Sequence, residues 1–118
     1  MNRTRSYIVA AVLIAFAAVG GYMIFGHTAT GGGHKAIDVT VTGANKMTPS
    51  NLTANQNDTV TINITSDTDG EVHLHGYDIH FETKAGQVVS QTFKADKTGH
   101  FDIEWESTSA PLGQLVVT

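Results

Sequence analysis

Residues 59–65 read Thr-Val-Thr-Ile-Asn-Ile-Thr, with an apolar side chain at every second position. Side chains on a β-strand point alternately to its two faces, so this stretch predicts a strand with one buried and one wet face. The same period of two recurs in residues 37–42, 101–106 and 115–117. The chain around residues 59–65 is therefore predicted to form an all-β domain.

Turn-forming residues separate these stretches. Asn, Asp, Gly or Pro occurs in each of the segments 55–58, 67–70, 84–86, 96–99 and 111–113. Such residues favour the backbone conformations that turns require. Short alternating strands joined by polar turns predict a small antiparallel β-sandwich with Greek-key connections.

The N-terminal part of the chain has a different character. Residues 8–25 (IVAAVLIAFAAVGGYMIF) carry no charge and follow Arg3 and Arg5. As a helix they would span about 27 Å, close to the ~30 Å hydrocarbon core of a bilayer. We expect a single-pass signal-anchor in the cell membrane, with the arginines inside and the C-terminal domain extracytoplasmic. The alternative is secretion after signal cleavage, although the segment lacks a clean Ala-x-Ala site.

These patterns divide the chain into three parts. Residues 1–25 form the membrane anchor or signal segment, residues 26–35 a Gly-rich linker, and residues 36–118 the folded domain. The linker contains three consecutive glycines at 31–33, which have high backbone freedom. His27 and His34 lie in this linker, and we expect them to be solvated.

Composition excludes several classes of function. The chain of 118 residues contains no cysteine, so it can form no disulfide, Fe–S cluster or thiolate metal site. Its formal net charge is -4, and beyond Lys35 four lysines face eleven carboxylates. An acidic domain has no electrostatic footprint for nucleic acid, but it can attract cations or a basic partner.

The histidine-rich segment 71–81 (EVHLHGYDIHF) is the main candidate for chemistry. His73 and His75 share one face of a predicted strand, roughly 6–7 Å apart at Cα, which is compatible with joint metal ligation. The apolar positions are even up to Leu74 and odd from Tyr77 onward. This change of parity predicts a β-bulge or a sharp bend at Gly76.

Four motifs follow one another along the domain: Pro49-x-x-Leu52, DTVTI at 58–62, FKADKTGHF at 93–101 and GQLVV at 113–117. In this order and spacing they resemble the cupredoxins. That family includes the sandwich domain of cytochrome oxidase subunit II and small membrane-anchored cupredoxin-like proteins of bacteria. The resemblance covers most of residues 36–118 and implies a Greek-key sandwich. His-Gly-Tyr-Asp at 75–78 recurs in a cupredoxin-like subgroup without a full blue-copper ligand set.

The blue-copper ligands of the family do not carry over. A blue-copper site takes one histidine from the middle of the domain, then Cys, His and usually Met before the last strand. The last three positions here hold Trp105, Thr108 and Pro111. The first histidine corresponds to His75, or to His73 if the alignment slips by two. The resemblance therefore implies the fold without blue-copper electron transfer or a thiolate-bridged binuclear copper centre.

The residues leave a different metal site open. Imidazole and carboxylate ligands suit Cu(II) or Zn(II), and we expect Cu(II) to be preferred. Two alternatives remain: a metal-free structural or partner-interaction sandwich, whose protein partner is unknown, and an electron-transfer accessory of a respiratory or copper-handling system. An enzyme is not expected, since no nucleophile elbow, phosphate loop or His-Glu-x-x-His motif is present. The candidate ligands are His73, His75, His80, His100, Glu104 and Glu106.

Overall fold

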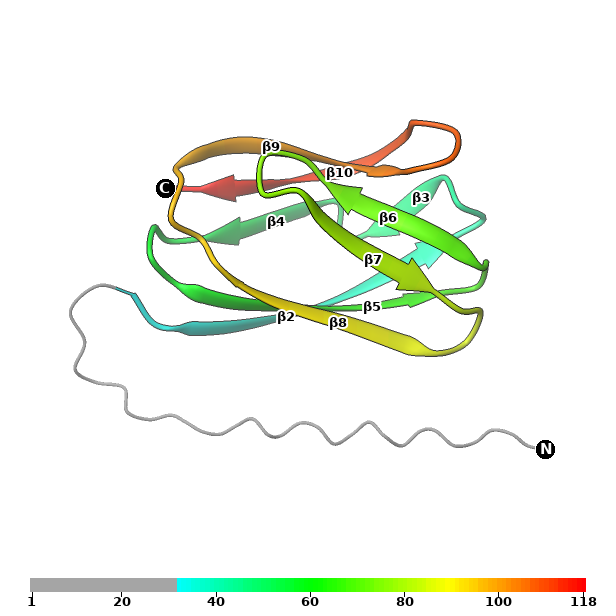
Figure 1. The fold of residues 1–118 in the computed structure, drawn as a ribbon, viewed down its shortest axis with the longest axis horizontal. Helices are drawn as coiled ribbons and strands as arrows, with labels where there is room; N and C mark the ends of the chain where they lie inside the picture. The colour runs from blue at the N-terminus through cyan, green and yellow to red at the C-terminus, as the bar shows by residue number, and fades with distance from the viewer. Residues whose placement is uncertain (1–31) are drawn as a thin grey trace.

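The computed structural model describes residues 32–118, which form a chain of short strands (Figure 1). The predicted signal-anchor, residues 8–25, lies outside the described residues. Within residues 32–118, no helix is long and apolar enough to cross a membrane. The strands are β2 (His34–Thr42), β3 (Lys46–Thr48), β4 (Asn51–Ala54), β5 (Thr59–Ser66), β6 (Gly70–Leu74), β7 (Ile79–Thr83), β8 (Val88–Lys94), β9 (Gly99–Trp105) and β10 (Ala110–Val117).

The strands form two sheets that face one another as a sandwich (Figure 1). One sheet has the order β4-β10-β9-β6-β7, and the other has the order β3-β2-β5-β8. The prediction of an all-β sandwich is confirmed, but the expectation of purely antiparallel pairing is wrong. β2 pairs in parallel with β5, and β4 pairs in parallel with β10. Between β2 and β5 the chain crosses to the opposite sheet through β4, and such crossovers permit parallel neighbours.

The core lies between the sheets and is built from the apolar positions of the alternating stretches. Along β5, burial alternates strictly, with Val60, Ile62 and Ile64 buried and the polar residues between them, Thr61 and Asn63, partly exposed. Each fully buried Val or Ile side chain contributes about 1.5–3 kcal/mol relative to an exposed one. The period of two therefore predicted which residues form the core.

The first strand begins inside the predicted linker. β2 starts at His34, which pairs with Thr59, and Lys35 pairs with Val60. The buried carboxylate of Asp58 accepts a hydrogen bond from the backbone N–H of Gly33 at 2.9 Å, and Thr59 N donates to the carbonyl of Gly33 at 2.7 Å. These bonds order residues 33–35 as part of the sheet, so the folded domain starts earlier than residue 36.

The change of parity at Gly76 is the turn of a β-hairpin. Leu74 pairs with Ile79 across β6 and β7, so even positions on one strand meet odd positions on the other. Gly76 has φ of 85°, and a Cβ at this position would overlap the Phe101 ring. The predicted sharp bend is thus a four-residue loop, 75–78, and no register shift is present between β6 and β7.

Candidate metal centre

The histidines of the 71–81 segment lie on the outer face of the five-stranded sheet. Val72 and Leu74 point into the core, so His73 between them points outward. His73 on β6 pairs with His80 on β7 and with Glu104 on β9. Residues paired directly across strands share a face, so the register itself gathers these three side chains.

His73 is at the centre of this group. Its ring stacks on that of His80, with centroids 4.2 Å apart and 11° between the planes. The ring of His75 lies 4.3 Å away on the other side, tilted by 49°. Only 14% of the His73 side chain is exposed. Its two neighbours and the sheet beneath it therefore fix its position.

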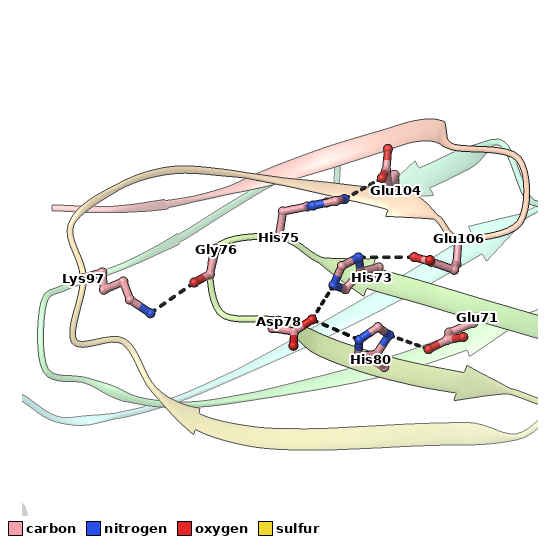
Figure 2. Close-up of polar contacts among 9 residues, drawn as sticks. All are labelled: Glu71, His73, His75, Gly76, Asp78, His80, Lys97, Glu104 and Glu106. Atoms are coloured by element: carbon pink, nitrogen blue, oxygen red, sulfur yellow. Dashed lines mark hydrogen bonds and ion pairs between the residues drawn. The ribbon is translucent and has the colours of Figure 1, made fainter.

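Carboxylates contact both ring nitrogens of two of the histidines (Figure 2). His73 Nε2 lies 3.0 Å from Asp78 Oδ1, and His73 Nδ1 lies 3.2 Å from Glu106 Oε1. His80 Nε2 lies 3.1 Å from the same Asp78 oxygen, and its Nδ1 lies 2.5 Å from Glu71 Oε2. Asp78 thus bridges the two stacked rings.

The third histidine has a partner of its own. His75 Nε2 lies 2.5 Å from Glu104 Oε2, and the backbone N–H of His75 donates to the carbonyl of Asp102 at 2.9 Å. His75 is the first residue of the hairpin loop, yet this backbone bond keeps it beside β9. The ring therefore stays over the sheet instead of following the loop outward.

The loop is held by Tyr77 and Lys97. The hydroxyl of Tyr77 donates to the Lys97 carbonyl at 2.6 Å and accepts from the Lys97 N–H at 3.0 Å. Lys97 Nζ donates to the Gly76 carbonyl at 3.1 Å (Figure 2). The Tyr77 ring packs against Phe93 and Phe101. These contacts fix the backbone that carries Asp78.

The charges of the cluster shift the pKa values of two groups in opposite directions. The hydrogen bond from His73, and then that from His80, lowers the pKa of Asp78. Desolvation lowers the pKa of His80, but hydrogen bonds and charges of Asp78 and Glu71 outweigh it and leave that pKa raised. The carboxylates therefore favour the positively charged ring at His80.

The predicted ligands form two overlapping triads. One is His73, His80 and Glu106, and the other is His73, His75 and Glu104; in each, one ligand atom per residue lies within 4.8 Å of the others. Metal–ligand bonds of about 2.0–2.2 Å place ligand atoms up to about 4 Å apart. Small side-chain movements would let either triad bind an ion, so these donors fit a Cu(II) or Zn(II) site.

His100 does not join either triad. Its Nδ1 lies 3.4 Å from Gln114 Oε1, and it pairs with Val116 on β10. Two carboxylates outside the predicted ligand set, Glu71 and Asp78, do contact the histidines. Glu71 could have been found, because it lies two residues before His73 on the same face. Asp78 could not, because its place depends on the positive φ of 54° in the loop.

The position of the blue-copper cysteine is occupied by a core residue, Trp105. Trp105 is buried, pairs with Val72, and leaves no room for a side chain at Gly70. Its indole lies on the inner face of the sheet, whereas His73 lies on the outer face. The residues at this position do not fit a blue-copper centre, and His73 does not point toward it.

Comparison with known proteins identifies the fold. No protein-family model matches the sequence, and no curated protein matches it either. A chain of a heme-copper terminal oxidase dimer superposes with a TM-score of 0.60 at 16% identity, over 71% of this chain and 65% of that one. A copper binding protein in its apo form gives 0.60 at 15% identity, over 70% and 86%. An oxidized amicyanin variant gives 0.52 at 20% identity, over 70% and 82%.

These similarities show that residues 32–118 form a cupredoxin-like domain. The identities are low, so the shared feature is the fold. The chain spans less than two thirds of the oxidase chain. What the domain binds has to be argued from its own residues.

Proposed function

We propose that this chain is a membrane-tethered, extracytoplasmic cupredoxin-like protein that binds a divalent metal ion without blue-copper electron transfer. The two triads that meet at His73 are the observation that carries this proposal. Three imidazoles and two carboxylates converge on one face of a rigid sheet, and each triad leaves a coordination position for water or another ligand.

Cu(II) is the preferred ion. Imidazole and carboxylate groups bind Cu(II) more tightly than they bind the other divalent first-row metals, following the Irving–Williams order. The additional carboxylates of Glu71 and Asp78 increase the negative potential around the rings, which attracts cations. A copper binding protein and an amicyanin are among the proteins that share the fold.

The cellular placement rests on the N-terminal sequence. Residues 8–25 are long and apolar enough to span a bilayer, and Arg3 and Arg5 favour an inside location for the N-terminus. The cupredoxin-like domain would then face the outside of the cell, tethered through residues 26–33. Adding protease to sealed spheroplasts would test this orientation. We expect the C-terminal domain to be digested, because it would lie on the outside.

A metal-free interaction module is the second candidate. It is favoured by the carboxylate partner that each of the three rings already has, since such a cluster is stable without an ion. A charged surface of this kind could contact a partner protein. Metal titration separates the two candidates.

The test uses the full-length untagged chain in detergent with His27→Ala and His34→Ala, which removes the histidines outside the cluster near the N-terminus. In this background Cu(II) binding is measured by calorimetry for His73→Ala and for His100→Ala. Both histidines occupy the outer face of the same sheet, but only His73 belongs to the triads. We expect His100→Ala to bind normally and His73→Ala to lose binding. Equal binding by the two variants, or no binding by the parent chain, would contradict the proposal.

A further inference from the structure

The two triads differ in where they lie on the sheet. The triad of His73, His75 and Glu104, called here the central triad, lies over β6 and β9, which are interior strands of the five-stranded sheet. The triad of His73, His80 and Glu106, called here the edge triad, includes a residue of β7, the terminal strand. Glu104 is 24% exposed and Glu106 is 45% exposed. The edge triad is therefore the more accessible one.

The two triads also differ in which ring must give up a carboxylate from outside the triad. Among the described residues, the ring of His75 contacts one carboxylate, Glu104, which is itself a member of the central triad. The ring of His80 contacts Glu71 and Asp78 through its two nitrogens, and neither belongs to the edge triad. An ion in the edge triad therefore displaces an outside carboxylate from His80 and leaves His73 with Glu106. An ion in the central triad leaves His75 with Glu104 and displaces Asp78 or Glu106 from His73.

We propose that the domain holds one ion at a time, that the ion rests in the central triad, and that the edge triad is its route in and out. This inference rests on the proposed function. His73 stays bound throughout, and the bonds to His75 and Glu104 are exchanged for bonds to His80 and Glu106. The exchange changes no oxidation state. The receiving partner offers its own nitrogen or sulfur ligands at the β7 edge.

The shared ligand is what makes this route favourable. An ion that moves between two sites with a common imidazole never has to recover its full hydration shell. The ring centroids of His75 and His80 lie 4.3 and 4.2 Å from that of His73, and Figure 2 draws the two rings on opposite sides of it. The histidines that exchange are thus both next to the ring that stays bound.

The experiment separates equilibrium affinity from the rate of release. The full-length chain in detergent, loaded with Cu(II), is mixed with excess EDTA, and copper loss is followed by stopped-flow absorbance. The variants are His75→Ala, His80→Ala and His100→Ala, all outward-facing positions, and circular dichroism confirms that each is folded. His100→Ala is the control for the loss of a histidine from the same face.

We expect His75→Ala to weaken Cu(II) binding by at least about 10-fold, the loss that follows even from removing an outer partner of a metal ligand. His80→Ala should weaken binding less than His75→Ala does and slow transfer to EDTA severalfold. The inference is overturned if His80→Ala releases copper as fast as the parent chain, if it weakens binding as much as His75→Ala, or if the parent chain binds two ions. Absence of any Cu(II) binding by the parent chain would overturn the proposed function as well.

Discussion

The two sheets of this sandwich present outer faces of different chemistry on the same kind of scaffold. On the four-stranded sheet, neutral groups dominate: the hydroxyls of Thr61 and Thr92 lie 2.8 Å apart, and Ser90 donates to Asn63 at 2.6 Å. On the five-stranded sheet, the equivalent cross-strand neighbours are His73, His80 and Glu104. Both faces follow from the period of two, so strand geometry alone gives either a passive polar surface or a set of metal ligands.

The chemistry of the outward side chains decides whether a face is a passive polar surface or a set of metal ligands. Hydroxyl and amide groups satisfy one another across the strands and are weak ligands for Cu(II). Imidazoles and carboxylates pair equally well in the absence of an ion, but they are the groups that Cu(II) and Zn(II) bind. We call the outer face of the five-stranded sheet the histidine face and that of the four-stranded sheet the neutral face. Substitutions beneath the histidine face, in its hairpin loop and on the neutral face test the difference between them.

The largest effect should come from Trp105, which lies beneath the histidine face. Trp105→Ala removes a buried aromatic side chain, and we expect the free energy of unfolding to fall by about 3–5 kcal/mol. Chemical denaturation followed by circular dichroism measures this loss. A change below about 1 kcal/mol would show that the indole does not contribute to the core as described.

The hairpin loop should give the next largest effect. Gly76→Ala places a methyl group against Phe101 at a φ of 85°, and we expect about 1–3 kcal/mol of destabilisation together with weaker Cu(II) binding, because the loop carries His75 and Asp78. Denaturation and calorimetry measure the two effects.

Gly86→Ala is a matched control for this change. Gly86 has a φ of 80°, nearly the same as Gly76, but a Cβ there would meet no atom within 4 Å. It should cost only about 1 kcal/mol, from the backbone conformation, and leave Cu(II) affinity unchanged. Equal effects of the two substitutions would remove the steric part of the explanation.

A smaller effect is expected on the neutral face. Thr61→Val removes one hydroxyl from the pair with Thr92 and keeps the β-branched shape, so the cost should be about 0.2–1 kcal/mol. Cu(II) affinity should be the same as that of the parent chain. A loss of copper binding in this variant would show that the ion binds to the other sheet.

The smallest effect concerns pH and lies outside both faces. The hydrogen bond from Gly43 N–H, and then that from the Thr68 hydroxyl, lowers the pKa of Asp67 below its ordinary value. A depressed folded-state pKa gives stability that is present above the unfolded-state pKa and is lost as the pH falls through the folded-state pKa. The stability difference between the parent chain and Asp67→Asn should therefore shrink as the pH falls from about 5 to about 2, the range in which carboxyl groups titrate. Parallel stability curves over that range would contradict it.

The fold was largely predictable because alternation is a local signal. Apart from Ser66 and Leu112, the buried residues of β2, β5, β9 and β10 lie at the apolar positions of their alternating stretches. The parallel pairing of β2 with β5 was not predictable, because it depends on how the chain crosses between sheets. The hairpin at Gly76 was predictable only in part. The change of parity indicated a bend there, but the pairing of His73 with His80 depends on the length of the loop.

The candidate site depends on register, which a single sequence does not define. His100 and Glu104 share a face of β9, yet only Glu104 pairs with His73. At about 3.3 Å per residue, the separation of four residues places His100 roughly 13 Å from Glu104 along the strand. Parity alone therefore groups His100 with the ligands, and only the pairing of β6 with β9 separates it from them.

The attachment of Gly33 to Asp58 and the parallel pairing of β2 with β5 bear on how the domain responds to mechanical load. The chain enters the sandwich at the start of β2, and eight consecutive positions from His34 to Val41 pair with Thr59 to Ser66. A pull on the preceding residues along the strand axis acts on these hydrogen bonds in shear, so they resist together instead of opening one after another. A domain held at this end would therefore keep its strands paired, and its outward face intact, when the tether is pulled.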